Sequence, residues 1–161
     1  MFSSSEFDRL INPTYQANNQ DNNQSNILAN RIEKSWTTRS GYNAICYANR
    51  GYRCGYVEIP INEIDMLDVN DPMDYNSYEI ECHGYLTFCG NAHWDKNNNN
   101  IWIGFDCTHY GDLFDSSLVS SLEYEILVDE HYNIGTIKTL EFVMNECEKI
   151  GEQLIQLLKE S

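Results

Sequence analysis

The sequence predicts an α+β fold, in which a small antiparallel β-sheet carries a C-terminal amphipathic helix packed on one face. Two patterns support this prediction. From Gly41 onward, segments rich in Tyr, Val and Ile follow the two-residue period of strands. Near the C-terminus, apolar residues recur at the spacings of three and four that a helix requires. The chain has 161 residues, of which 42% are hydrophobic, and this suits one domain with its own core.

The N-terminal residues 1–26 differ in composition from the rest of the chain. They are rich in Ser, Asn and Gln, most densely from Asn18 to Asn26, and such a segment cannot bury enough apolar surface to fold alone. We therefore predict a polar arm over residues 1–26 and a single α+β domain over residues 27–161. Residues 27–36 are expected to form a short helix with their apolar side chains on one side.

Four strands are predicted in the middle of the chain. Residues 42–48 and 52–59 flank Asn49-Arg50-Gly51, which predicts a hairpin because Asn and Gly tolerate positive φ. Residues 78–88 and 101–107 are expected to form the third and fourth strands, with a turn over residues 91–100. Residues 61–77, which are acidic and contain Pro72, and residues 111–121 are expected to be loops.

The C-terminal helix is the clearest element of the sequence. Its apolar stripe consists of Leu140, Val143, Cys147, Ile150, Leu154 and Leu157. These spacings predict an amphipathic helix of about five turns, capped by Thr136 or Thr139. The apolar stripe must be covered, and the sheet is the obvious partner.

The charge of the chain excludes one class of function. The net charge is −15, and a chain this acidic is unsuited to gripping the phosphate backbone of nucleic acid. Residues 1–55 carry +2 and residues 56–161 carry −17. A bound anion would therefore be met by the arginines of the first third, Arg39, Arg50 and Arg53, although surface arginines are more often merely solvated.

The cysteines and the hydropathy pattern indicate the compartment. There are six cysteines, but no CxxC pair of the kind that structural zinc sites use. We expect most of them to be buried apolar residues in a reducing, cytoplasmic environment. No apolar run approaches the ~20 residues of a membrane-spanning helix, and residues 1–10 lack the pattern of a signal peptide.

Polar side chains with possible chemical roles lie in the predicted third strand and at the end of the predicted fourth strand. Side-chain alternation places Glu81, His83, Tyr85 and Thr87 on one strand face and Cys82, Gly84, Leu86 and Phe88 on the other. In the fourth strand, Ile101, Ile103, Phe105 and Cys107 are expected to face the core, opposite Trp102, Gly104 and Asp106. If these strands pair, His83 and Asp106 share the face away from the helix, and His109 and Asp112 follow in a loop.

Three functional interpretations of this cluster compete. His83, Asp106, His109 and Asp112 could hold a divalent cation. Alternatively, Asp106 could orient His83 or His109 for acid–base catalysis. In a ligand site, aromatic side chains would stack on a ring while His83, Thr87 and Asp106 bond to its edges; these aromatics are Tyr42, Tyr52, Tyr56, Tyr85, Trp94 and Trp102. A purely structural role for His83 and Asp106 is the fourth alternative.

Four segments of the chain resemble a family of small proteins encoded by phages, prophages and some bacteria. They are Cys54-Gly55-Tyr56-Val57-Glu58-Ile59-Pro60, His83 to Gly90, Trp102 to Asp112, and Leu140 to Leu154. The resemblance runs from about Gly41 to Leu157. The family commonly has a second glycine after His-Gly, where this chain has Tyr85.

The resemblance implies a context rather than an established activity. Small accessory phage proteins are often inhibitors of host defence, and some bind or cleave nucleotide-derived immune signals. We therefore expect a counter-defence protein of the host cytoplasm that sequesters a small nucleotide-derived ligand. His83, Thr87, Asp106, His109 and Asp112 would read polar groups, Tyr85 and Trp102 would stack, and Arg50 and Arg53 would meet phosphate.

Two alternatives to sequestration remain open at this level. The protein could be a metal-dependent, phosphoesterase-like hydrolase that uses His83, Asp106, His109 and Asp112. It could also be an acidic inhibitor that docks on a basic host protein. In each case we expect no nucleic-acid partner, no membrane association, no cofactor other than a divalent metal, and a homo-oligomer.

Overall fold

The computed structural model describes residues 30–67, 80–95, 100–127 and 135–160. The predicted polar arm, residues 1–26, lies outside these described residues. No helix in the described part of the chain is both long enough and apolar enough to cross a membrane.

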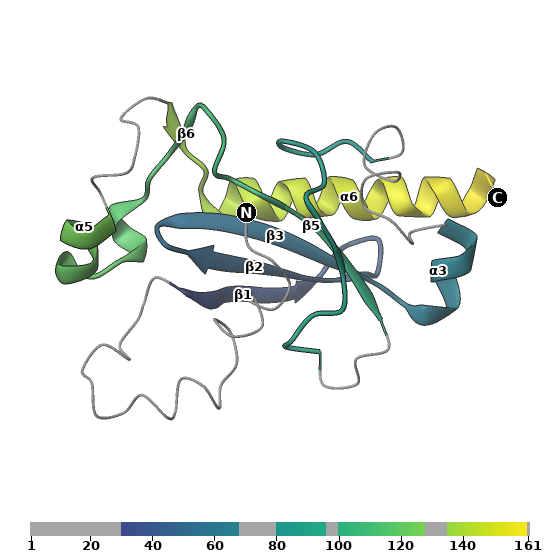
Figure 1. Ribbon diagram of the computed structural model, residues 1–161. Helices are drawn as coiled ribbons and strands as arrows, with labels where there is room; N and C mark the ends of the chain where they lie inside the picture. Colours follow the sequence, from purple (N-terminus) through teal and green to yellow (C-terminus); the bar gives the residue numbers. More distant parts are fainter. Residues whose placement is uncertain (1–29, 68–79, 96–99, 128–134, 161) are drawn as a thin grey trace.

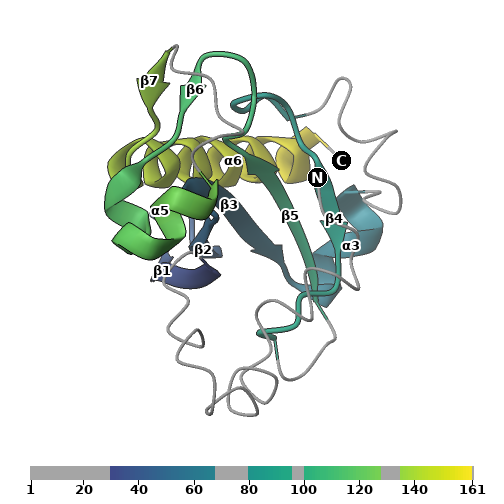
Figure 2. The ribbon, with the colours of Figure 1, turned by 60° about the vertical axis from the view of Figure 1, so that its left-hand side comes forward.

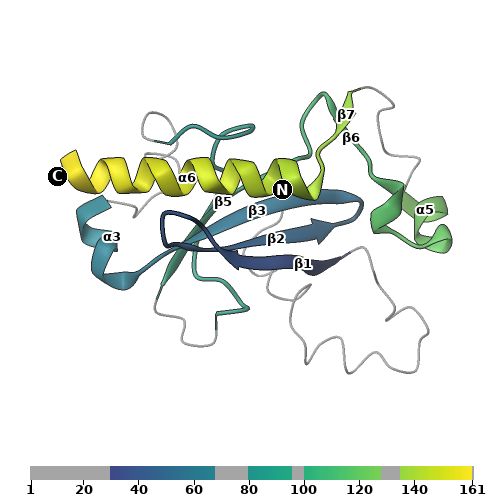
Figure 3. The same cartoon turned by 180° about the vertical axis from the view of Figure 1, so that it is seen from behind.

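The main sheet has five strands and only antiparallel pairs. Its spatial order is β1 (Asn30–Thr37), β2 (Asn43–Asn49), β3 (Tyr52–Ile59), β5 (Ile101–Asp106) and β4 (Phe88–Gly90). The long helix α6 (Leu140–Glu160) crosses one face of this sheet (Figures 1 and 3). The predicted α+β class, with a small antiparallel sheet and a C-terminal helix on one face, is confirmed.

Smaller elements lie at the two ends of the sheet. Helix α3 (Ile61–Leu67) is near the C-terminal end of α6. At the other end, β6 (Asp112–Leu113) and β7 (Thr136–Ile137) form a short parallel pair beside the start of α6 (Figure 2). A 3₁₀ turn, η1 (Ser116–Leu118), and helix α5 (Ser121–Leu127) follow β6. The short parallel pair is the element that brings β6 next to the segment entering α6.

The predicted hairpin is confirmed. Asn49 pairs with Tyr52, so Arg50 and Gly51 form a two-residue turn. Their φ angles are +53° and +89°, and positive φ at both central positions is what a type I′ hairpin turn requires. A side chain at position 51 would also collide with the ring of Phe114, 2.0 Å from the nearest ring atom.

The C-terminal helix has the cap and the buried stripe that the sequence predicts. The amide of Phe142 donates to Thr139 Oγ1 at 3.1 Å, so Thr139 is the capping residue. Val143, Cys147, Ile150 and Leu154 of α6 are fully buried against the sheet. From the sheet, Val57, Ile103 and Phe105 belong to the same core, as the predicted inward face of β5 requires.

The opposite face of the sheet is covered as well. A second buried cluster there contains Ile45, Tyr47, Cys54, Tyr56, Phe88, Ala92 and Trp102, with Trp94 packed against it. Burial on both faces explains why almost every residue of β2 and β3 is buried.

The helix predicted over residues 27–36 is wrong for the part that the structure describes. Residues 30–37 form β1, which pairs along its whole length with β2. A helix would place Ile32 and Trp36 on one buried stripe, but in the strand Ile32 is 41% exposed while Trp36 packs on the α6 side. Pairing with the hairpin edge therefore decides this element, because it satisfies the backbone that a short helix would leave to water.

The loop predicted over residues 61–77 contains helix α3 at its start. This helix begins directly after Pro60, whose carbonyl accepts from the Glu63 amide at 2.9 Å, and the fixed φ of proline suits the start of a helix. The loop predicted over residues 111–121 likewise contains β6 and η1. In both segments, local sequence propensity did not predict the regular secondary structure that the fold contains.

The predicted third strand is mostly irregular. Among its described residues 80–88, only Phe88 belongs to β4. A β-turn spans Cys82–Tyr85, where the Tyr85 amide donates to Cys82 O at 3.0 Å and Gly84 has a φ of +64°. Leu86 consequently packs in the helix-side core and Phe88 in the opposite cluster. The common face predicted for Cys82, Leu86 and Phe88 is therefore wrong.

Candidate functional site

Two histidines and a buried aspartate meet where three segments converge. His83 lies in the turn before β4, His109 lies in the turn after β5, and Asp112 is the first residue of β6. The side chain of Asp112 is only 1% exposed. His83 Nε2 lies 2.9 Å from both of its carboxylate oxygens, so a shared hydrogen bond joins a half-buried imidazole to a buried carboxylate.

His109 contacts two carboxylates. Its Nδ1 lies 3.5 Å from Asp112 Oδ2 and its Nε2 lies 3.6 Å from Asp106 Oδ1. Its backbone amide also donates to Asp112 Oδ2 at 3.0 Å. The His83 and His109 rings meet edge to face with centroids 5.7 Å apart. His109 is the more accessible of the two, with 39% of its side chain exposed.

Lys138 completes the surroundings of Asp112. Its Nζ lies 3.0 Å from Asp112 Oδ1 and donates to Gly111 O, Thr136 O and Thr136 Oγ1 at 3.1, 3.2 and 2.8 Å. Burial alone would raise the pKa of Asp112, but hydrogen bonds from His83, the His109 amide and Lys138 hold that pKa below its ordinary value. Asp112 is therefore ionised at neutral pH.

The turn that presents His83 depends on glycine. A Cβ at position 84 would lie 2.2 Å from His109 Cε1, so only glycine lets the two histidines approach. The φ of +64° favours glycine independently. The His83 amide donates to Glu146 Oε1 of α6 at 2.8 Å, and its ring packs against Phe142 at 5.2 Å. His83 is thus anchored on the helix, and its predicted place on the face away from the helix is wrong.

Asp106 is close to this cluster but is held by other groups. Its Oδ2 accepts from Thr87 Oγ1 at 3.2 Å, and its Oδ1 accepts from Thr108 Oγ1 and the Thr108 amide at 2.7 and 3.2 Å. The structure therefore brings His83, His109, Asp112 and Asp106 together, and Thr87, which is also a predicted site residue, joins them through Asp106. His109 is the residue that links the two carboxylates.

The cluster has the composition and spacing of a metal site. One ligand atom from each of His83, His109 and Asp112 can be chosen so that all three lie within 4.8 Å of one another. Two imidazole nitrogens and one carboxylate oxygen suit Zn²⁺, Mn²⁺ or Fe²⁺, with positions left open for water or substrate. Around the Asp112 carboxylate, His83 and the His109 amide lie at hydrogen-bond distance and Lys138 forms an ion pair.

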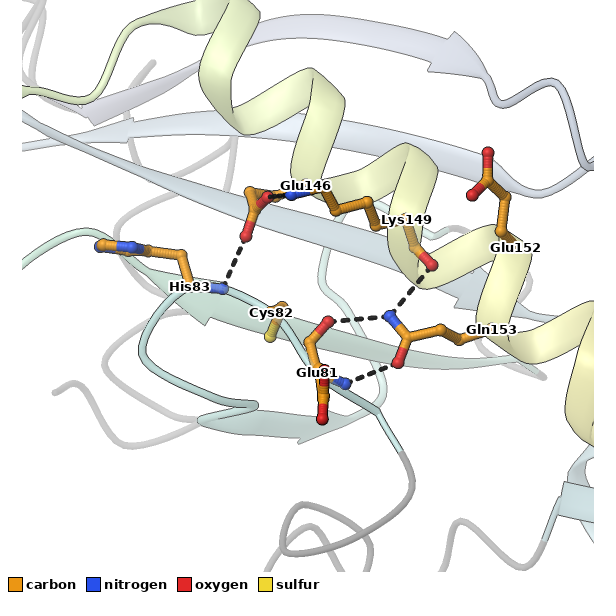
Figure 4. A pocket seen from close by; sticks show the side chains of 7 residues that line it. All are labelled: Glu81, Cys82, His83, Glu146, Lys149, Glu152 and Gln153. Carbon is orange, nitrogen blue, oxygen red and sulfur yellow. Dashed lines mark hydrogen bonds and ion pairs between the residues drawn. The ribbon is translucent and has the colours of Figure 1, made fainter.

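A groove of about 410 Å³ runs along α6 next to His83. It is lined by Glu81, Cys82, His83, Glu146, Lys149, Glu152 and Gln153 (Figure 4), and the His83 ring points away from the other six side chains. Burial, with a contribution from Glu146, raises the pKa of Cys82 to about 12. Cys82 is therefore a neutral thiol and not a nucleophile.

The arginines predicted to meet an anion lie elsewhere or are already bonded. Arg53 is 7% exposed, and its guanidinium bonds to Glu33, to Asp115 and to Lys138 O. A phosphate would have to compete with these two carboxylates. Arg39 pairs with Glu148 of α6 at 3.4 Å, and Arg50 is exposed at the β2–β3 turn.

The aromatic residues predicted to stack on a ligand are mostly buried in the fold. Trp102 is 4% exposed and lies in the cluster on the far face of the sheet, as do Tyr56 and Trp94, and Tyr42 is in the helix-side core. Tyr85 differs, with 61% of its surface exposed. Tyr52 is half-buried and packs against Phe114, and burial, with a smaller contribution from Asp112, raises the pKa of its hydroxyl. The stacking role therefore remains open for Tyr85 and Tyr52 among these residues.

Sequence reasoning missed Lys138, Phe142 and Glu146. Lys138 precedes α6, and Phe142 and Glu146 lie in its first two turns. The sequence around these residues indicates only a helix cap and the faces of an amphipathic helix. Contact with residues 83 and 112 arises only when α6 packs on the sheet.

Comparisons with protein-family models, with curated proteins and with solved structures each find no match to this chain.

Proposed function

We propose that the protein is a metal-dependent hydrolase that acts on a small nucleotide-derived phosphoester. The observation that supports this proposal is the convergence of His83, His109 and Asp112 within 4.8 Å around a carboxylate that is almost fully buried. His83, His109 and Asp112 would hold a divalent cation, whose chemistry there would be to lower the pKa of a bound water so that hydroxide is available at neutral pH.

The reaction balances with water as the only co-substrate. The hydroxide would add to phosphorus, the ester P–O bond would break, and the leaving oxygen would take up the proton that the water had lost. A bound cation would also attract the anionic substrate. The chain itself would repel it, because the net charge is −15 and Arg53 already bonds to two carboxylates. Attraction of an anion would come from the bound metal, because Lys138 already bonds to Asp112, Gly111 O and Thr136.

We further propose that this reaction serves a counter-defence role in the cytoplasm of a phage host. It rests on the resemblance of residues 83–90 and 102–112 to small phage proteins. The substrate would then be an immune signal built from nucleotides. An oligomeric form of the protein belongs to the same proposal.

The first experiment separates metal binding from the rest of the proposal. Titration calorimetry with Mn²⁺ and Zn²⁺ should give one site per chain, and His109→Ala should lose at least tenfold in affinity. His93→Ala is the matched control, because His93 is a histidine of the described chain outside the cluster. Absence of a site in the wild-type protein, or equal losses in both variants, would reject the metal centre.

The second experiment tests catalysis. Cyclic mono- and dinucleotides are incubated with the Mn²⁺-loaded protein, and the products are separated by chromatography. We expect linear or shorter products whose formation is abolished by EDTA and by His109→Ala. Full activity in EDTA would refute the metal mechanism.

Sequestration without cleavage is a second candidate, favoured by one observation. Asp112 already accepts bonds from Lys138, from His83 and from the His109 amide, so its charge is compensated without any metal. In this case heating the incubated protein would release the nucleotide unchanged, and EDTA would not reduce the amount bound.

A further inference from the structure

Two exposed tyrosines flank the histidine cluster in the sequence and in the fold. Tyr85 follows His83 and Gly84, and it is 61% exposed. Tyr110 follows His109 directly, and it is 82% exposed. Gly84 lies against the His109 ring. Tyr85 directly follows Gly84 and Tyr110 directly follows His109, so each tyrosine is the sequence neighbour of one of these two residues in contact.

Each tyrosine belongs to a turn that also contains a member of the cluster. The turn Cys82–Tyr85 has His83 and Gly84 at its centre, and the turn His109–Asp112 has Tyr110 and Gly111 at its centre. In the second turn the Asp112 amide donates to His109 O at 2.9 Å, and Gly111 has a φ of +94°. Both tyrosines are therefore fixed to the same backbone framework as the histidines.

The backbone of Tyr85 is strained. Its φ is +66°, and Arg50 of the hairpin turn is the only other non-glycine residue with a positive φ in the described part of the chain. Large side chains are uncommon in this conformation, and glycine or asparagine would adopt it more easily.

Nothing in the described part of the fold compensates this strain through the side chain of Tyr85. Among the described residues, the Tyr85 ring and hydroxyl make no hydrogen bond, ion pair or ring contact. The described fold therefore shows no side-chain contact that would offset the strain at Tyr85. Strained residues cluster at active sites, ligand clamps and switch regions.

We propose that Tyr85 and Tyr110 form an aromatic rim that stacks on a planar ring of the ligand bound at the histidine cluster. This inference rests on the proposed function and specifies its substrate class: a phosphoester with a nucleobase or similar planar ring. Tyrosine suits this role because a rigid aromatic face contacts a base at a small entropic cost. The cluster holds the charged end of the ligand, and the rim selects its ring.

The test compares two probes that differ only in the base. AMP and ribose 5-phosphate share the sugar and the phosphate, and their affinities for the Mn²⁺-loaded protein are measured by calorimetry. Since one stacked base contributes about tenfold or more in affinity, AMP should bind at least ~10-fold more tightly than ribose 5-phosphate. Tyr85→Phe should keep this ratio, and Tyr85→Asn and Tyr110→Ala should each lower it.

Thermal unfolding of the same variants tests the strain argument. Asparagine tolerates the φ of position 85, so Tyr85→Asn should unfold at the wild-type temperature or above it while losing the preference for AMP. A lower unfolding temperature in Tyr85→Asn would show that the fold holds the ring and would overturn the inference.

Different results would refute the aromatic rim and the metal centre. Absence of Mn²⁺ binding refutes the metal centre. Equal affinity for AMP and ribose 5-phosphate, measured with and without Mn²⁺, refutes the rim even where the metal binds. A preference for AMP that persists in Tyr85→Asn and in Tyr110→Ala would also refute it, because the ring would then be bound elsewhere.

Discussion

Gly84→Ala is the substitution that tests the geometry of the cluster most directly. The added Cβ would lie 2.2 Å from His109 Cε1, whereas ordinary contacts begin at 3.4 Å. The His109 ring must therefore retreat by about 1.2 Å. Because a Cβ at position 84 would also crowd Nδ1 and Nε2 of the ring, the retreat displaces both possible metal-binding atoms of His109 from the arrangement that can share one cation with His83.

The expected effect has two parts. The φ of +64° at position 84 adds a strain of about 1–2 kcal/mol for alanine, which lowers the unfolding temperature by roughly 2–8 °C in a domain of this size. The displacement of His109 should lower the affinity for Mn²⁺ by about 10–100-fold, the range seen when the orientation of a metal ligand is disturbed. Calorimetry and thermal unfolding measure the two parts independently.

Gly41→Ala is the matched control. Gly41 has a φ of +97°, but a Cβ there would meet no heavy atom within 4 Å. This variant should lose stability through backbone strain alone and bind Mn²⁺ with wild-type affinity. Wild-type affinity in Gly84→Ala, or equal losses of affinity in both variants, would refute the assignment of His109 to the site.

Three further predictions concern the rest of the fold. Arg53→Met should destabilise the protein by about 3–5 kcal/mol in chemical denaturation, because it leaves the carboxylates of Glu33 and Asp115 buried and uncompensated; a loss below 1 kcal/mol would contradict this. Burial opposes ionisation of Asp115, but bonds from Ser117 and Arg53 hold its pKa below the ordinary value, so its stabilisation is present above about pH 4 and is lost as the pH falls further. The stability gap between wild type and Asp115→Asn should therefore narrow between pH 6 and pH 3, and a constant gap would exclude this linkage. Thr139→Ala should cost about 0.5–2 kcal/mol through loss of the α6 cap, whereas Thr139→Ser should keep most of the stability.

The inertness of the cysteines follows from their burial. Burial is the main factor that raises the pKa of Cys54 to about 12 and raises the pKa values of Cys46, Cys107 and Cys147 above their ordinary range. None of the six cysteines forms a disulfide. This agrees with the sequence-based interpretation of most of these residues as small apolar side chains.

The sequence by itself determined the elements whose signals are local. The hairpin follows from Asn49-Arg50-Gly51 between two alternating segments, and α6 follows from a stripe of apolar residues with a threonine cap. It also predicted His83, Asp106, His109 and Asp112 in one region, because its pattern predicts that residues 78–88 and 101–107 pair as strands.

The tertiary structure alone decided what surrounds those residues. Residues 30–37 become a strand because the hairpin offers an edge to pair with. Residues 80–87 bend away from strand geometry because Gly84 turns the chain, and this places His83 against Phe142 of α6 instead of on the open face of the sheet. Lys138 reaches Asp112 only through the parallel pairing of β6 with β7. Contacts between residues 25 to 60 positions apart leave no periodic trace in a single sequence, so the partners that tune the cluster become apparent only in the packed fold.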